Sequence, residues 1–137
     1  MNKPQPQFGT FRAEHIDGGE YVYGASVVHN GEYFIVTYIS EGNKLTNVWN
    51  RIDPTTLSAY TTKSDSNGKP IFGNFEVDGV MTDRGDEVNG INEFDCSNIA
   101  DNGKVVWKYL SWRFLTDGHY YPLTDYMNLT IIPRERK

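Results

Sequence analysis

The sequence has a single cysteine, Cys96, and no apolar run near the roughly 20 residues that a membrane-spanning helix needs. One cysteine excludes an intrachain disulfide, which suits a reducing cytoplasm. The opening residues, MNKPQPQ, lack the hydrophobic core of a secretory signal, and we expect residues 1–7 to be a disordered lead-in. We therefore expect a cytoplasmic protein that does not enter a membrane.

The motifs of common catalytic and cofactor sites are also missing. There is no GxSxG elbow, no phosphate-binding P-loop and no GxGxxG fingerprint. The three histidines are widely spaced and form no zinc-binding pattern with each other or with Cys96. Cys96 itself lies among acidic residues, which disfavour a thiolate nucleophile. We expect no enzymatic activity, no cofactor and no metal; a metal-dependent enzyme that uses paired acids is the second alternative.

Aromatic residues, by contrast, are abundant at 14% of the chain, although apolar residues as a whole reach only 38%. Aromatic and β-branched side chains fit half-buried sheet faces, and here pairs such as Asn-Gly separate runs of them. A chain of 137 residues is long enough for one domain with a real core. We predict a mainly β fold with a single domain over residues 8–137. It is a barrel-like or strongly bent antiparallel sheet of hairpins, with at most one or two short helical turns.

Two segments have clear local signals. Residues 20–28 and 32–39 flank an Asn-Gly pair and predict a hairpin. Residues 53–60 predict a short helical turn, because Asp53 can cap it and Pro54 suits its first position.

The C-terminal part predicts further strands. Asn102-Gly103 is expected to turn the chain, and residues 104–115 follow it. This segment has apolar residues at helical spacing, but its Val, Trp, Tyr and Phe content favours one strand. Residues 119–132 are expected to close the sheet, with a bend at Pro122.

The segment KSDSNGKPIF (63–72) could either bind a calcium ion or turn between two strands. Aligned on Gly68, an EF-hand loop would begin at Lys63 and end at Asn74, so a cation and an amide stand where carboxylate ligands are needed. Asn67-Gly68 instead suits a two-residue type I′ turn. We therefore predict a hairpin turn here.

Negative charge is concentrated in one part of the chain. Residues 76–101 hold eight acidic side chains against Arg84 alone, a local net charge of −7, whereas the whole chain carries −5. Such a run is either a solvated loop face or a surface that docks onto a basic partner. The predicted acidic partner-binding surface consists of Glu76, Asp78, Asp83, Asp86, Glu87, Glu93 and Asp95.

In residues 104–115, KVVWKYLSWRFL, cations are interleaved with aromatic rings. If this segment is one strand, Trp107, Tyr109 and Arg113 share a face on which nucleic-acid bases could stack. The net charge of −5 opposes phosphate contact, and the rings could instead form part of the core. The alternative nucleic-acid-binding site consists of Lys104, Trp107, Lys108, Tyr109, Trp112 and Arg113.

A series of short motifs runs through residues 11–72. It comprises Phe11-Arg12, Tyr21-Val22-Tyr23-Gly24, Ile52-Asp53-Pro54, Tyr60-Thr61 and Asn67-Gly68-Lys69. In this order and spacing the motifs resemble the YopX-like family of small bacteriophage and prophage proteins. Residues 73–88 depart from the family, which has an E-G-D-I-V element there. The resemblance implies a β fold, a phage origin and action inside a bacterial host, and it supplies no catalytic residues.

Together these patterns predict a non-catalytic phage or prophage protein that binds a host or phage macromolecule inside the bacterial cell. A regulatory or anti-defence role would fit. The expected partner is a protein with a basic surface, and nucleic acid is the alternative partner. Self-association stays open as well, because exposed sheet edges need cover.

Overall fold

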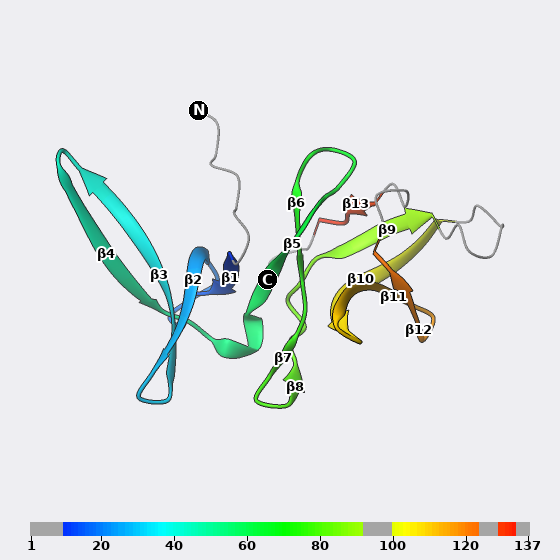
Figure 1. Cartoon of the computed structure of the whole chain (residues 1–137), viewed down its shortest axis with the longest axis horizontal. Helices are drawn as coiled ribbons and strands as arrows, with labels where there is room; N and C mark the ends of the chain where they lie inside the picture. The colour runs from blue at the N-terminus through cyan, green and yellow to red at the C-terminus, as the bar shows by residue number, and fades with distance from the viewer. Residues whose placement is uncertain (1–9, 92–99, 124–128, 134–137) are drawn as a thin grey trace.

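The computed structural model describes residues 10–91, 100–123 and 129–133, and they form two antiparallel sheets and a small hairpin (Figure 1). The first sheet has the spatial order β4-β3-β2-β1-β5-β6. Its strands are β1 (Phe11–Glu14), β2 (Tyr21–His29), β3 (Glu32–Glu41), β4 (Lys44–Arg51), β5 (Ser58–Ser64) and β6 (Pro70–Gly73).

The second sheet has the order β12-β11-β10-β9-β13. Its strands are β9 (Glu87–Ile91), β10 (Ala100–Lys108), β11 (Ser111–Thr116), β12 (His119–Pro122) and β13 (Thr130–Ile131). Between the two sheets in sequence lies a two-stranded hairpin of β7 (Glu76–Val77) and β8 (Val80–Met81). The predicted mainly β fold is thus confirmed, and its described strands form open sheets rather than a closed barrel.

The hairpin predicted around Asn30-Gly31 is confirmed as β2 and β3. Asn30 and Gly31 have φ values of +50° and +75°, as a type I′ turn requires, and His29 pairs with Glu32 across it. The predicted helical turn is also present, as the 3₁₀ helix η1 (Pro54–Thr56). The Asp53 side chain caps it by accepting a hydrogen bond from the backbone N–H of Thr55 at 3.0 Å.

The turn predicted in residues 63–72 is present, but it is not type I′. Only Gly68 has a positive φ, +79°, and the backbone N–H of Asp65 donates to the carbonyl of Lys69. This three-residue loop forms because the Asp65 carboxylate accepts from the N–H groups of Asn67 and Lys69. The same carboxylate accepts a hydrogen bond from the N–H of Ile131 in β13 at 3.1 Å, so the loop is tied to the second sheet.

The prediction of one strand over residues 104–115 is wrong. The chain reverses at Tyr109 and Leu110, whose φ values are +54° and +63°, and β11 returns alongside β10. Residues with bulky side chains rarely adopt this conformation. Cross-strand packing outweighs that local cost, because the reversal buries Val105 against Phe114 in the core.

A further prediction about this region is also wrong. Asn102-Gly103 does not turn the chain but lies inside β10, where a Cβ on Gly103 would be 2.4 Å from the carbonyl oxygen of Leu115. The segment predicted to close the sheet supplies both of its edge strands: β12 pairs with β11, whereas β13 pairs with β9 at the opposite edge of the sheet.

Each sheet has its own hydrophobic core. In the first, Ala13, Ile35, Ile52 and Leu57 are buried on one face, which Phe75 and Val77 of the β7–β8 region cover. The core of the second also takes a residue from the first sheet: Ile71 of β6 packs with Val88, Val105, Phe114 and Leu129.

Asn74, immediately after β6, joins the two sheets. Its backbone N–H donates to the carbonyl of Val105, and its carbonyl accepts from the N–H of Trp107, both at 2.8 Å. Its side-chain oxygen accepts from the N–H of Gly85 at 2.6 Å. Asn74 therefore fixes the segment that leads from β8 to β9 against the junction of the sheets.

Candidate binding surfaces

The predicted acidic residues separate into three groups in the structure. Glu76, Asp78, Asp83 and Glu87 are exposed, as a partner-binding surface requires. Asp86 is largely buried and belongs to the interior. Glu93 and Asp95 lie outside the described residues.

Asp86 is a correction to the predicted surface. Its side chain is only 12% exposed, and its Oδ1 accepts a hydrogen bond from Nη2 of Arg12 at 3.0 Å. Its Oδ2 accepts from the backbone N–H of Phe72 at 2.8 Å. Both oxygens are therefore engaged inside the protein, and a docking partner would have to break this ion pair to reach the carboxylate.

Arg12 is buried because aromatic rings enclose its guanidinium group. The guanidinium carbon lies 4.7 Å from the ring centroids of both Tyr21 and Phe72, and Nη2 also donates to the carbonyl of Arg84 at 3.2 Å. Such stacking favours a delocalised cation. Arg12 and Asp86 thereby hold β1, β6 and the segment before β9 together.

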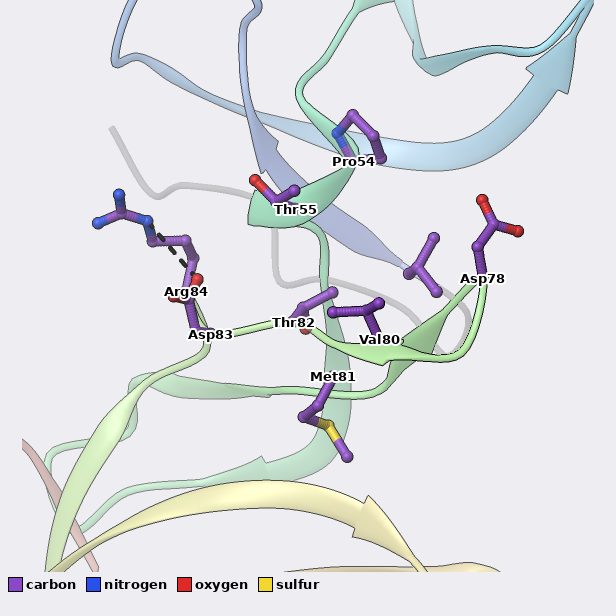
Figure 2. Close-up of a pocket in the computed structure, with 9 residues that line it drawn as sticks. Pro54, Thr55, Asp78, Val80, Met81, Thr82, Asp83 and Arg84 are labelled. Atoms are coloured by element: carbon purple, nitrogen blue, oxygen red, sulfur yellow. Dashed lines mark ion pairs between the residues drawn. The ribbon is translucent and has the colours of Figure 1, made fainter.

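Two of the exposed acids, Asp78 and Asp83, border a groove of about 440 Å³ between the β7–β8 hairpin and η1 (Figure 2). Val77, Val80 and Met81 give the groove apolar walls, while Pro54 and Thr55 of η1 line its opposite side. Figure 2 shows Asp78 at one end and Asp83 with Arg84 at the other. The groove therefore combines an apolar interior with charge at both ends. We call it the acidic groove.

Hydrogen bonds and ion pairs position the charges of the acidic groove. Asp78 Oδ2 accepts a hydrogen bond of 2.6 Å from the hydroxyl of Tyr33 in β3. This bond to the carboxylate, followed by partial desolvation and the nearby negative charge, raises the pKa of Tyr33 above its ordinary value. At the other end, Nε of Arg84 lies 3.9 Å from an oxygen of Asp83 and 3.9 Å from one of Glu14.

This geometry suits a cationic side chain with an aliphatic stem. Lysine and arginine bury such stems along apolar surface while their charged ends remain hydrated or paired. The stem would contact Val77 and Val80, and the cation would reach either Asp78 or Asp83. The Asp83 side chain is 72% exposed, so a cation of the partner could approach it beside Arg84.

Sequence reasoning identified the acids of this groove but missed its apolar walls. A signal was present in Val77-Asp78-Gly79-Val80, where Asp-Gly between valines is typical of a type I′ hairpin. Asp78 and Gly79 adopt φ values of +51° and +80°. The approach of η1 and the bond from Tyr33 depend on the tertiary fold and have no local signal.

The residues of the predicted nucleic-acid site do not share one face. Trp107 and Trp112 are cross-strand partners, with ring centroids 5.3 Å apart, and Trp112 packs against the core of the second sheet. Lys108 and Arg113 lie on the opposite face, where Nε of Arg113 donates to the carbonyl of Lys108 at 2.9 Å. Lys104 lies nearer the middle of β10, opposite Leu115.

A smaller group does come together at the β10–β11 turn. The Tyr109 ring lies 5.3 Å from the guanidinium carbon of Arg113 and 5.6 Å from Nζ of Lys108. Its centroid is 5.7 Å from that of Tyr120 in β12, in an edge-to-face arrangement. This cluster combines two half-buried cations with two exposed rings, although it lacks both tryptophans.

Among the described residues, no three or more His, Cys, Asp or Glu side chains are arranged to hold a metal ion. Cys96 lies outside the part of the chain that the structure describes. Within that same part, no helix has the length and apolar character needed to cross a membrane.

Comparisons with known proteins add no relative: no family model, curated protein or solved structure matches the chain significantly. The resemblance of residues 11–72 to the YopX-like family therefore stays a prediction.

Proposed function

We propose that this chain is a non-catalytic binding protein that captures a basic segment of another protein in its acidic groove. Following the motifs of residues 11–72, we propose a phage or prophage origin and action in the cytoplasm of the bacterial host. The observation that carries the binding proposal is the placement of Asp78 and Asp83 at opposite ends of an apolar groove. By occupying the basic surface of a host protein, this chain would act as a regulator or as an anti-defence protein.

Charge and apolar contact have different tasks in this proposal. An exposed ion pair contributes only about 0–1 kcal/mol, so Asp78 and Asp83 alone would bind weakly. Burial of one or two aliphatic stems against the apolar walls would add roughly 25 cal/mol of favourable free energy per Å² of apolar surface removed from water. The net charge of −5 would mainly accelerate the approach of a basic partner. Binding should therefore weaken as salt is added.

The proposal can be tested by capture from a bacterial host lysate with an immobilised double variant, Asp78→Asn with Asp83→Asn. We expect it to lose partners that the unmodified protein retains, and the partners it still captures should elute with a weaker salt dependence. A control with the same charge change is Glu41→Gln with Asp117→Asn, at exposed turns far from the groove in sequence. Unaltered capture and salt dependence in the Asp78/Asp83 variant would contradict the proposal.

The cluster at the β10–β11 turn supports a second candidate function, binding of single-stranded nucleic acid. Lys108 and Arg113 could contact phosphates while a base stacks near Tyr109. A gel shift at about 50 mM salt, where electrostatic binding is strong, tests this function. A shift that disappears in Tyr109→Ala and Arg113→Ala would favour it over the protein-binding proposal, whereas no shift would remove it.

A further inference from the structure

The β3–β4 hairpin extends away from the other strands as a two-stranded arm (Figure 1). Every residue from Tyr38 to Asn47 is exposed, which includes the outer half of both strands. A two-stranded ribbon without further packing is marginally stable in water. The arm therefore lacks the cover that the rest of the first sheet receives.

Strand register places several apolar residues on one face of this region. Val36 pairs with Trp49, Tyr38 with Asn47, Ser40 with Leu45 and Val27 with Phe34. Because directly paired residues share a face and successive residues alternate, these eight residues lie on the same side of the sheet. We call its accessible apolar part the outer apolar face, which consists of Val27, Phe34, Tyr38, Leu45 and Trp49; Val36, the sixth apolar residue on this side, is only 7% exposed.

The outer apolar face lies on the side of the sheet away from the first core. Ile35, which alternates with Phe34 and Val36, is fully buried in that core. Phe75 and Val77, which cover this core, therefore lie on the opposite side of β3 from the outer apolar face. Tyr38, Leu45 and Trp49 remain 61%, 67% and 50% exposed.

The outer apolar face also lacks charge in its middle. The nearest titratable groups on the same side are His29, whose ring centroid lies 6.3 Å from that of Trp49, and Glu32 with Arg51, which form an ion pair of 3.4 Å at the base of the arm. Trp49 is held in place by edge-to-face contact with Phe34, with ring centroids 5.5 Å apart. The surface offered to a partner is thus apolar, neutral and partly ordered by its own rings.

The edge of the arm is unprotected as well. β4 is the edge strand of the first sheet, and its residues 45–50 contain neither a charge nor a proline. Natural edge strands usually carry such features, because an open row of backbone groups invites pairing. The exposed face and the unprotected edge lie on the same element.

We propose that a second copy of this chain covers the outer apolar face, so that the protein forms a reversible dimer through its β3–β4 arms. Two copies each carry a net charge of −5 and repel one another. A neutral surface such as the outer apolar face lets them associate without adding to this repulsion. A basic partner would be drawn to the acidic groove instead, because this face offers it no countercharge.

The area of the face is consistent with a weak dimer. From typical side-chain areas, its five residues expose roughly 400 Å² of apolar surface per copy. A standard interface buries about 800 Å² per partner, of which roughly 65% is apolar in homodimers, or about 500 Å². Ser40 and Asn47, which lie among the apolar residues, would contribute part of the polar remainder. We expect dissociation constants in the micromolar range rather than a permanent dimer.

Sedimentation equilibrium from about 1 to about 200 µM, a range that brackets micromolar affinity, tests the proposal. We expect a monomer–dimer equilibrium that added salt strengthens or leaves unchanged, because salt screens the repulsion between copies. Leu45→Lys should weaken the dimer at least tenfold although it lowers the net negative charge. Leu110→Lys, at a residue 88% exposed on the second sheet, is the matched control and should change nothing.

Three results would overturn the dimer: a monomer throughout this range, no effect of Leu45→Lys, or an equal effect of Leu110→Lys. Circular dichroism of both variants checks that the fold is retained, and Tyr38→Lys provides a second exposed position on the face. The Asp78→Asn with Asp83→Asn variant should dimerise normally. The dimer and the acidic groove can thus fail independently of one another.

Discussion

The ion pair of Arg12 and Asp86 allows the most direct test of the structure. The two side chains are only 10% and 12% exposed, and Nη2 of Arg12 lies 3.0 Å from Oδ1 of Asp86. We consider the replacement Arg12→Met, which keeps an unbranched side chain between the rings of Tyr21 and Phe72. The change removes the cation and leaves the carboxylate inside the protein.

The expected cost follows from what remains around each group. Removing one partner of a buried ion pair typically destabilises a protein by about 3–5 kcal/mol. The destabilisation by Arg12→Met should lie near 3 kcal/mol, the lower end of this range. Asp86 keeps the hydrogen bond from the N–H of Phe72, and no hydrogen bond is lost at Nε of Arg12 because this atom has no partner among the described residues. Asp86→Asn keeps its volume and should cost about 2–3 kcal/mol, as for a lost hydrogen bond to a charged group.

Urea unfolding followed by far-UV circular dichroism measures these free energies. The double variant Arg12→Met with Asp86→Asn should cost less than the sum of the single variants, by about 1–3 kcal/mol, because the groups are in direct contact. The control is Arg51→Met, which disrupts an exposed pair with Glu32 and should cost no more than about 1 kcal/mol. Additive effects, or a cost of Arg12→Met no larger than the control, would refute the interior placement of Asp86.

Three further predictions concern single contacts. Asp78→Asn should lower the pKa of Tyr33 toward 10.0, which NMR of ¹³C-labelled tyrosine can measure. Because folding raises this pKa, the hydrogen bond from Tyr33 to Asp78 should stabilise the protein fully below about pH 10, and this stabilisation should be lost as Tyr33 ionises. The loss should be larger in the unmodified protein than in the variant. Gly73→Ala should destabilise the protein by about 1–3 kcal/mol in thermal unfolding, because the new Cβ would lie 2.5 Å from the Trp112 ring; an unchanged melting temperature would contradict that packing. Leu110→Gly should stabilise the protein by about 0.5–1 kcal/mol in urea unfolding, because it relieves a positive φ and removes no buried contact; a loss of stability would mean that this side chain is covered.

The sequence by itself determined the features that depend on neighbours in the chain. Asn30-Gly31 specified the β2–β3 hairpin because these two residues accept positive φ values at little cost. Asp53 and Pro54 specified η1 because the cap and the restricted φ act within three residues. The abundance of aromatic residues sufficed for the mainly β class.

Only the tertiary structure decided which local signals were overridden. Tyr109 and Leu110 turn the chain although neither is a turn residue, because Val105 and Phe114 gain a buried contact across the strands. Asn102-Gly103 would turn the chain on its own signal, yet it lies within a strand.

The candidate sites divide in the same way. Asp78 and Asp83 could be identified from local charge, but Asp86 is removed from that surface by Arg12, 74 residues earlier in the chain. The walls of the acidic groove and the outer apolar face likewise join segments that no spacing in the sequence connects. Backbone preference acts over a few residues, whereas burial and ion pairing depend on which distant segments meet, and only the folded chain decides that.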